Sequence, residues 1–131
     1  MAGTWLMGAG AATAGRRPTA VLVAVHPEDG DGSGPGSETS LAELTRLADT
    51  DGLTVADAVV QNRPRPDPAT FVGSGKVDEL AAAAERTHAD VVIADGELSP
   101  GQVRNLEERT GVRVAAGWPA ALAWASAAPV R

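Results

Sequence analysis

Residues 90–114 read DVVIADGELSPGQVRNLEERTGVRV, and this stretch decides the fold. Its opening run, 90–95, is β-branched and apolar at its centre, which predicts a strand buried on both faces. Ser99 and Pro100 predict the start of a helix, because serine caps helix N-termini and proline is tolerated in the first turn. Gly111 predicts the end of that helix, and the Val-Arg-Val that follows predicts another strand. A strand, a helix and a strand in close succession indicate parallel neighbours joined by a right-handed crossover.

The same alternation extends toward the N-terminus of the chain. Ser40 and Glu43 have the spacing of a capping box and predict the start of a further helix. The additional predicted elements are strands over 19–25 and 54–61 and helices over 41–50 and 77–87. The sequence therefore predicts an α/β fold: a small open parallel four-stranded sheet, in the order 2-1-3-4, with helices on both faces.

The chain has 131 residues, which suits one domain, and its elements divide it into three parts. Residues 1–18 are expected to be a flexible leader, 19–116 the α/β domain, and 117–131 a divergent tail rich in Ala and Trp. In the tail, Trp118 and Trp124 are expected to dock on the sheet or to form a dimer contact, because large aromatic side chains commonly anchor cores and interfaces.

Composition excludes several classes of protein. The absence of cysteine excludes disulfide frameworks, thiol nucleophiles and Cys-based zinc sites. A net charge of −6 disfavours a general nucleic-acid coat protein, which needs surplus Lys and Arg. No stretch is long enough to span a bilayer, and no basic region precedes the apolar N-terminus as it would in a secretory signal. We therefore expect a cytoplasmic protein with no membrane partner, no metal and no cofactor.

The first candidate site lies where predicted strands end, because ligands of open α/β sheets bind outside the carboxyl ends of the strands. His26 follows the first strand, and Asp95 and Glu97 follow the third, so these three are candidates for proton transfer. The alternative roles are structural: His26 would bond its own loop, and the two carboxylates would complement the N-terminus of the next helix. Arg63 and Arg65 follow the second strand on a proline-rich segment. That segment is expected to present them outward, either to solvent or to a phosphate or acidic partner.

A glycine-rich turn at the start of the 77–87 helix is the second candidate, and it comprises Gly73, Ser74, Gly75 and Lys76. Free N–H groups at a helix N-terminus favour anions. A nucleotide phosphate loop is not expected, because its pattern needs Gly where Thr70 stands and Ser or Thr where Val77 stands. A plain tight turn remains the alternative reading.

The basic side chains of these segments are expected to converge on one rim at the strand ends. The predicted rim comprises Arg63, Arg65, Lys76 and Arg104. Because the net charge is negative, any phosphate contact made by this rim has to be local.

Two long motifs resemble a known family. Residues 61–80, QNRPRPDPATFVGSGKVDEL, and residues 95–107, DGELSPGQVRNLE, resemble the N-terminal domain of the HflX family of ribosome-associated GTPases. The segments 20–26 and 40–44 fit as well. The resemblance implies a small parallel α/β domain, which in the family precedes a helical arm and a GTPase domain and helps to engage the large ribosomal subunit. It also implies nucleotide or RNA binding by this domain.

The sequence departs from the family pattern in two places. After Val114 the chain reads AAGWP instead of continuing toward long antiparallel helices, and the Walker lysine and switch regions of a GTPase domain are absent. GTP hydrolysis is therefore not expected of this chain. Gly96 also stands where a second acidic residue is usual.

Two hypotheses of different classes follow. The first is a non-catalytic binding module that contacts ribosomal RNA, a nucleotide or a protein partner through the basic rim. The alternative is a recruited enzyme or small-molecule-binding protein of a metabolic or biosynthetic pathway. It would use His26, Asp95 and Glu97 for proton transfer, with Arg63 or Lys76 holding an anionic ligand. A homodimer is compatible with either, because a small sheet leaves its edges uncovered.

Overall fold

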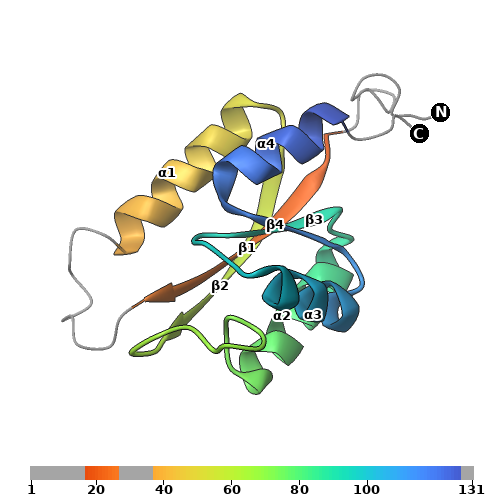
Figure 1. The fold of residues 1–131 in the computed structure, drawn as a ribbon. Coiled ribbons are helices and arrows are strands. Elements are labelled where there is room, and N and C mark those ends of the chain that lie inside the picture. The colour runs from red at the N-terminus through yellow and green to blue at the C-terminus, as the bar shows by residue number, and fades with distance from the viewer. Residues whose placement is uncertain (1–16, 27–36, 128–131) are drawn as a thin grey trace.

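The computed structural model describes residues 17–26 and 37–127 (Figure 1). Most of the predicted leader, residues 27–36 and the last four residues lie outside the described part. Strands and helices alternate along the chain as β1 (Thr19–His26), α1 (Ser37–Thr50), β2 (Thr54–Asn62), α2 (Ser74–Thr87), β3 (Val91–Ala94), α3 (Pro100–Thr110), β4 (Arg113–Ala116) and α4 (Gly117–Ala127).

The four strands form one parallel sheet in the order β2-β1-β3-β4, which confirms the predicted topology. Val23 of β1 lies opposite Val59 of β2 on one side and Ala94 of β3 on the other. Ala94 in turn lies opposite Ala116 of β4. The strands therefore end along one common edge, called here the carboxyl edge.

Helices cover both faces of the sheet, with α1 and α4 on one side and α2 and α3 on the other (Figure 1). Alternate side chains of β1 point to opposite faces. Val21 and Val23 pack into the core on the α2–α3 side, whereas Ala20 and Leu22 pack into the core on the α1–α4 side. β1 is thus buried on both faces, as its uninterrupted apolar run predicts.

The helix α3 begins and ends where the sequence predicts. Ser99 Oγ accepts a hydrogen bond of 3.1 Å from Gln102 N, and Gln102 Oε1 accepts one of 2.8 Å from Ser99 N. These reciprocal bonds form a capping box. Gly111 ends the helix in the left-handed conformation, at φ 77°.

Two other helices begin earlier than predicted. α1 starts at Ser37, so the prediction that Ser40 caps it is wrong. The strong helix breakers nearest to this start, Pro35 and Gly36, precede Ser37, and nothing between Ser37 and Ser40 opposes a helix. α2 starts at Ser74 instead of residue 77, since the glycine of its first turn is compatible with helical geometry.

The segment described above as a tail forms the helix α4. Ala121 is fully buried, and Trp118 and Trp124 are partly buried against the core on the α1–α4 side. The predicted docking of the two tryptophans on the sheet is confirmed, whereas the dimer contact stays a prediction. Within residues 17–26 and 37–127, no helix has both the length and the hydropathy needed to cross a membrane.

Candidate functional site

The loops that leave β1, β2 and β3 meet at the carboxyl edge of the sheet. Arg63 N donates a hydrogen bond of 2.9 Å to His26 O, which joins the ends of β1 and β2. Asp95 N donates one of 2.8 Å to Val23 O, which places the end of β3 beside β1. The sequence therefore placed His26, Arg63 and Asp95 on the correct edge.

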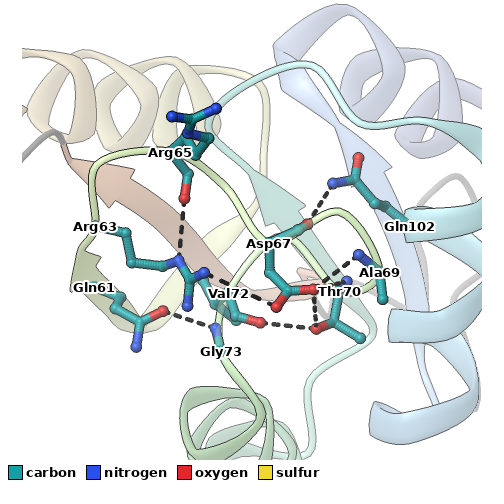
Figure 2. A network of polar contacts seen from close by, with 9 residues as sticks. All are labelled: Gln61, Arg63, Arg65, Asp67, Ala69, Thr70, Val72, Gly73 and Gln102. Atoms are coloured by element: carbon teal, nitrogen blue, oxygen red, sulfur yellow. Dashed lines mark hydrogen bonds and ion pairs between the residues drawn. The ribbon is translucent and has the colours of Figure 1, made fainter.

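The loop between β2 and α2 is folded around the carboxylate of Asp67 (Figure 2). Its Oδ1 accepts hydrogen bonds from Ala69 N at 2.8 Å and from Thr70 N at 3.1 Å. These backbone bonds, aided by the nearby Arg63 guanidinium, lower the pKa of Asp67 below its ordinary 3.8. Asp67 is not among the predicted site residues, although an Asp at the start of a Pro-containing turn is a recognised turn signal.

The helix α3 holds this loop from the side. Gln102 Nε2 donates a hydrogen bond of 2.7 Å to Asp67 O, and Asn105 Nδ2 donates one of 2.9 Å to Ala69 O (Figure 2 shows the first). The same Gln102 amide caps α3 through Ser99. The loop is thereby fixed to a helix at two points, and the groups it carries are held in one arrangement.

Arg63 folds back onto the loop, contrary to the prediction that it extends outward. Its Nε donates a hydrogen bond of 3.1 Å to Arg65 O, and its Nη2 lies 3.9 Å from Asp67 Oδ2 (Figure 2). Its side chain is only 30% exposed. The alternating prolines set the extended path of the backbone, whereas the Arg65 carbonyl and the half-buried carboxylate of Asp67 position the guanidinium.

Gly73 lies directly beneath the Arg63 guanidinium. A Cβ at this position would lie 3.0 Å from Arg63 Nη1 and 3.3 Å from Gln61 Nε2, so the close approach depends on glycine. Gly73 N also donates a hydrogen bond of 2.7 Å to Gln61 Oε1. A positive charge is therefore packed against the N-cap residue of α2.

The N-terminus of α2 carries no side-chain cap from its N-cap residue, Gly73. Ser74 and Gly75 are exposed, and Lys76 lies in the first turn, as predicted. Lys76 Nζ forms an ion pair of 3.0 Å with Glu79 Oε1. Its charge is thus partly offset within the helix.

Arg104, the fourth basic residue of the predicted rim, lies on α3 close to Gln102 in sequence but on another face of the helix. It is exposed on α3, two residues after the Gln102 side chain that touches the loop. Two residues correspond to roughly 200° around a helix. Arg104 therefore lies on a different face of α3 from Gln102, and the rim of Arg63, Arg65, Lys76 and Arg104 stays a prediction.

Phe71 and Gly96 join the β2–α2 loop to the β3–α3 loop. Phe71 is buried at 3% exposure and has a φ of 68°, which is unusual for a bulky side chain. A Cβ on Gly96, whose φ is 155°, would lie 3.4 Å from the Phe71 ring. This contact was not predicted, since it joins two loops that are distant in sequence.

The three proton-transfer candidates share an edge but not a hydrogen-bonded network. Across the described residues, no hydrogen bond joins His26 to Asp95 or to Glu97. His26 Nε2 is buried without a hydrogen-bond partner in that part of the chain. Asp95 is half-buried, whereas Glu97 is exposed.

Two hollows on the surface lie away from the three proton-transfer candidates. One, of about 570 Å³, lies between β4 and α4, and the other, of about 630 Å³, lies beside α1 and the start of β2. Neither is lined by His26, Asp95 or Glu97.

An open parallel α/β domain with a pinned, arginine-bearing loop at its carboxyl edge is the class of protein that these features define. The sequence profile of one family, described as GTP-binding GTPase N-terminal, matches residues 38–116, and the chain belongs to this family. It is similar to the N-terminal part of the proteins called GTPase HflX.

Three relatives show the extent of that similarity. The GTPase HflX of Lacrimispora saccharolytica is 38% identical over 94 residues, which cover 72% of this chain and 21% of the relative. That of Alkalihalophilus pseudofirmus is 43% identical over 77 residues, covering 59% and 18%. That of Escherichia coli K12 is 40% identical over 74 residues, covering 56% and 17%. The chain thus spans about a fifth of the length of these relatives.

Proposed function

We propose that this domain is a non-catalytic binding module that docks on RNA of the large ribosomal subunit through its carboxyl edge. The observation that carries the proposal is the Arg63 guanidinium held against Gly73, at the uncapped N-terminus of α2. A fixed cation beside free helix N–H groups suits a phosphate oxygen. The partner class follows from the membership of the HflX family, whose resemblance implies contact with the ribosome.

Two further cations support phosphate contact at the same edge. Arg65 is exposed, and its backbone carbonyl holds Arg63 in place. Lys76 lies one turn into α2 and keeps Glu79 as its partner until a stronger anion displaces it. The contact is local, since the chain as a whole carries a charge of −6. A ribosomal partner also implies a cytoplasmic location.

The enzyme hypothesis has weaker support. A general acid or base acts from within hydrogen-bond reach of the proton that it transfers, so it has to face a hollow that can hold a substrate. Neither of the two hollows described above is lined by His26, Asp95 or Glu97, and Glu97 is open to solvent. We therefore assign these side chains no catalytic role.

Co-sedimentation with purified bacterial large ribosomal subunits across a salt series tests the proposal. Three phosphate contacts give a slope of log K against log salt of about −2 to −3. Arg65→Ala is expected to reduce that slope by about one. Arg104→Ala is the matched control, because it removes another exposed arginine, on a face of α3 other than the one that contacts the loop. A slope near zero, or equal losses in both variants, would contradict the proposal.

A further inference from the structure

The two outer strands of the sheet, β2 and β4, each have one side without a neighbouring strand. Unpaired N–H and C=O groups on such an edge are a template for a strand from another chain. Proteins that stay monomeric therefore need some device that occupies or distorts the edge. In this domain a carboxylate paired with an arginine accepts a hydrogen bond from a backbone N–H at each of these two outer strands.

At the β4 edge, Val114 N donates a hydrogen bond of 3.0 Å to Glu107 Oε2. Because this N–H is bonded to a side chain, it does not form one of the backbone hydrogen bonds that join β4 to β3. It therefore lies on the open side of β4. Arg113 Nε lies 3.6 Å from the same Glu107 oxygen and partly neutralises it. A carboxylate of α3 thus occupies the position that the carbonyl of an added strand would take.

At the β2 edge, Ala58 N donates a hydrogen bond of 2.7 Å to Asp57 Oδ1. The other Asp57 oxygen forms an ion pair with Arg86 of α2. The register against β1 shifts at this point, so that Ala56 has no partner and the strand bulges. Bulges and charged side chains both disfavour strand addition.

The β4 edge would otherwise be well suited to an added strand. The hollow of about 570 Å³ runs beside it, and its lining is mostly apolar. Val103 lies on the α2–α3 face and Trp124 on the α1–α4 face. A strand placed there would bury both of its faces, and β4 of a second copy has three apolar residues, Val114, Ala115 and Ala116, that suit such a position.

We propose that the Glu107–Arg113 and Asp57–Arg86 pairs close the two sheet edges against strand addition by a second copy of this chain. Each carboxylate accepts a hydrogen bond from an outward-facing backbone N–H, and each arginine offsets the negative charge of that carboxylate. Neither pair lies at the carboxyl edge, where the strands end and where the candidate site is. This inference is independent of the ribosomal proposal, and it disfavours the predicted homodimer wherever that dimer would form through strand edges.

The test compares Glu107→Ala with Glu107→Gln, because glutamine keeps an acceptor oxygen for Val114 N. Sedimentation velocity over a concentration series reports assembly, and amide hydrogen exchange reports Val114. Wild type and Glu107→Gln are expected to be monomeric with slow exchange at Val114. Glu107→Ala is expected to exchange Val114 roughly ten-fold faster when dilute, and to dimerise with renewed protection of Val114 when concentrated.

Two results would overturn this proposal. One is a Glu107→Ala protein that folds, stays monomeric and keeps the exchange rate of the wild type. The other is a wild-type protein that self-associates with added protection at Val114 or Ala58. Should Glu107→Ala fail to fold, Asp57→Ala against Asp57→Asn applies the same comparison to the β2 edge, with Ala58 as the reporting amide.

Discussion

The side-chain amide of Gln102 donates a hydrogen bond of 2.7 Å to the backbone carbonyl of Asp67, and its oxygen accepts one of 2.8 Å from Ser99 N. One side chain therefore caps α3 and also fixes the loop that carries the candidate site. The stability of the helix start and the order of the binding loop are coupled through this residue.

Replacing Gln102 by alanine removes both bonds. We expect Gln102→Ala to lower the free energy of unfolding by about 1–2 kcal/mol, since it removes part of a capping box and leaves a loop carbonyl without its donor. Urea denaturation followed by circular dichroism measures the change. Arg104→Ala on the same helix is the control and is expected to stay within about 0.5 kcal/mol of wild type; equal losses would contradict the assigned role.

Acid is expected to weaken the loop through Asp67. Its pKa is lowered in the folded state by the backbone hydrogen bonds from Ala69 and Thr70, so its contribution to stability is fully present above the unfolded value near 3.8. That contribution is lost as the pH falls from about 4 through the lower folded value. Asp67→Asn keeps an acceptor oxygen but does not titrate. The free energy of unfolding of the variant should therefore fall less than that of wild type between about pH 5 and about pH 2. Parallel curves of stability against pH would show that Asp67 is not the titrating group responsible.

Gly96 and Gly101 are expected to respond in opposite directions to alanine. Gly96→Ala places a Cβ on a residue with φ 155° and 3.4 Å from the Phe71 ring, so we expect a loss of about 1–3 kcal/mol. Gly101 lies in the first turn of α3, and a Cβ there would lie 3.8 Å from Ser99 Oγ, an ordinary contact distance. Gly101→Ala should stabilise the domain by up to about 1 kcal/mol. Thermal unfolding of the two variants measures whether each is more or less stable than wild type. A Gly96→Ala variant that is more stable than wild type would show that Gly96 is not restricted by its φ or by the Phe71 ring.

Gly73→Ala is expected to displace the Arg63 guanidinium. The added methyl would lie 3.0 Å from Arg63 Nη1, and the flexible arginine moves more easily than the backbone. We expect the chemical shift of the Arg63 Nε–H proton to move toward that of an arginine without a hydrogen bond, because the bond to Arg65 O is lost. The free energy of unfolding is expected to change by less than about 1 kcal/mol. Gly75→Ala is the control, because no atom lies within 4 Å of a Cβ there. An unchanged Arg63 resonance in Gly73→Ala would show that the close approach is not restrictive.

The order of the strands and the bounds of α3 could be read from the sequence because their signals are local. A capping serine followed by proline, a terminal glycine and buried β-branched runs act within a few residues of one another, and crossover handedness then leaves few topologies. The start of α1 was mispredicted at Ser40 because a capping box marks only one of several positions at which a helix can begin. The 3.6-residue period of α3 places Arg104 and Gln102 on different faces of the helix, and this separation can be read from the sequence once the helix is predicted.

Sequence alone determined that this chain forms a parallel α/β domain and that His26, Arg63 and Asp95 lie at one edge, because strand polarity brings every strand end to the same side. Only the tertiary structure decided that Arg63 turns inward and that Phe71 meets Gly96, and it also showed a carboxylate at each sheet edge. Phe71 and Gly96 belong to loops far apart in the chain, so no local pattern encodes their contact. The contacts of Arg63 and of the edge carboxylates are closer in sequence, but they depend on side-chain positions of a few ångströms that strand and helix patterns do not encode.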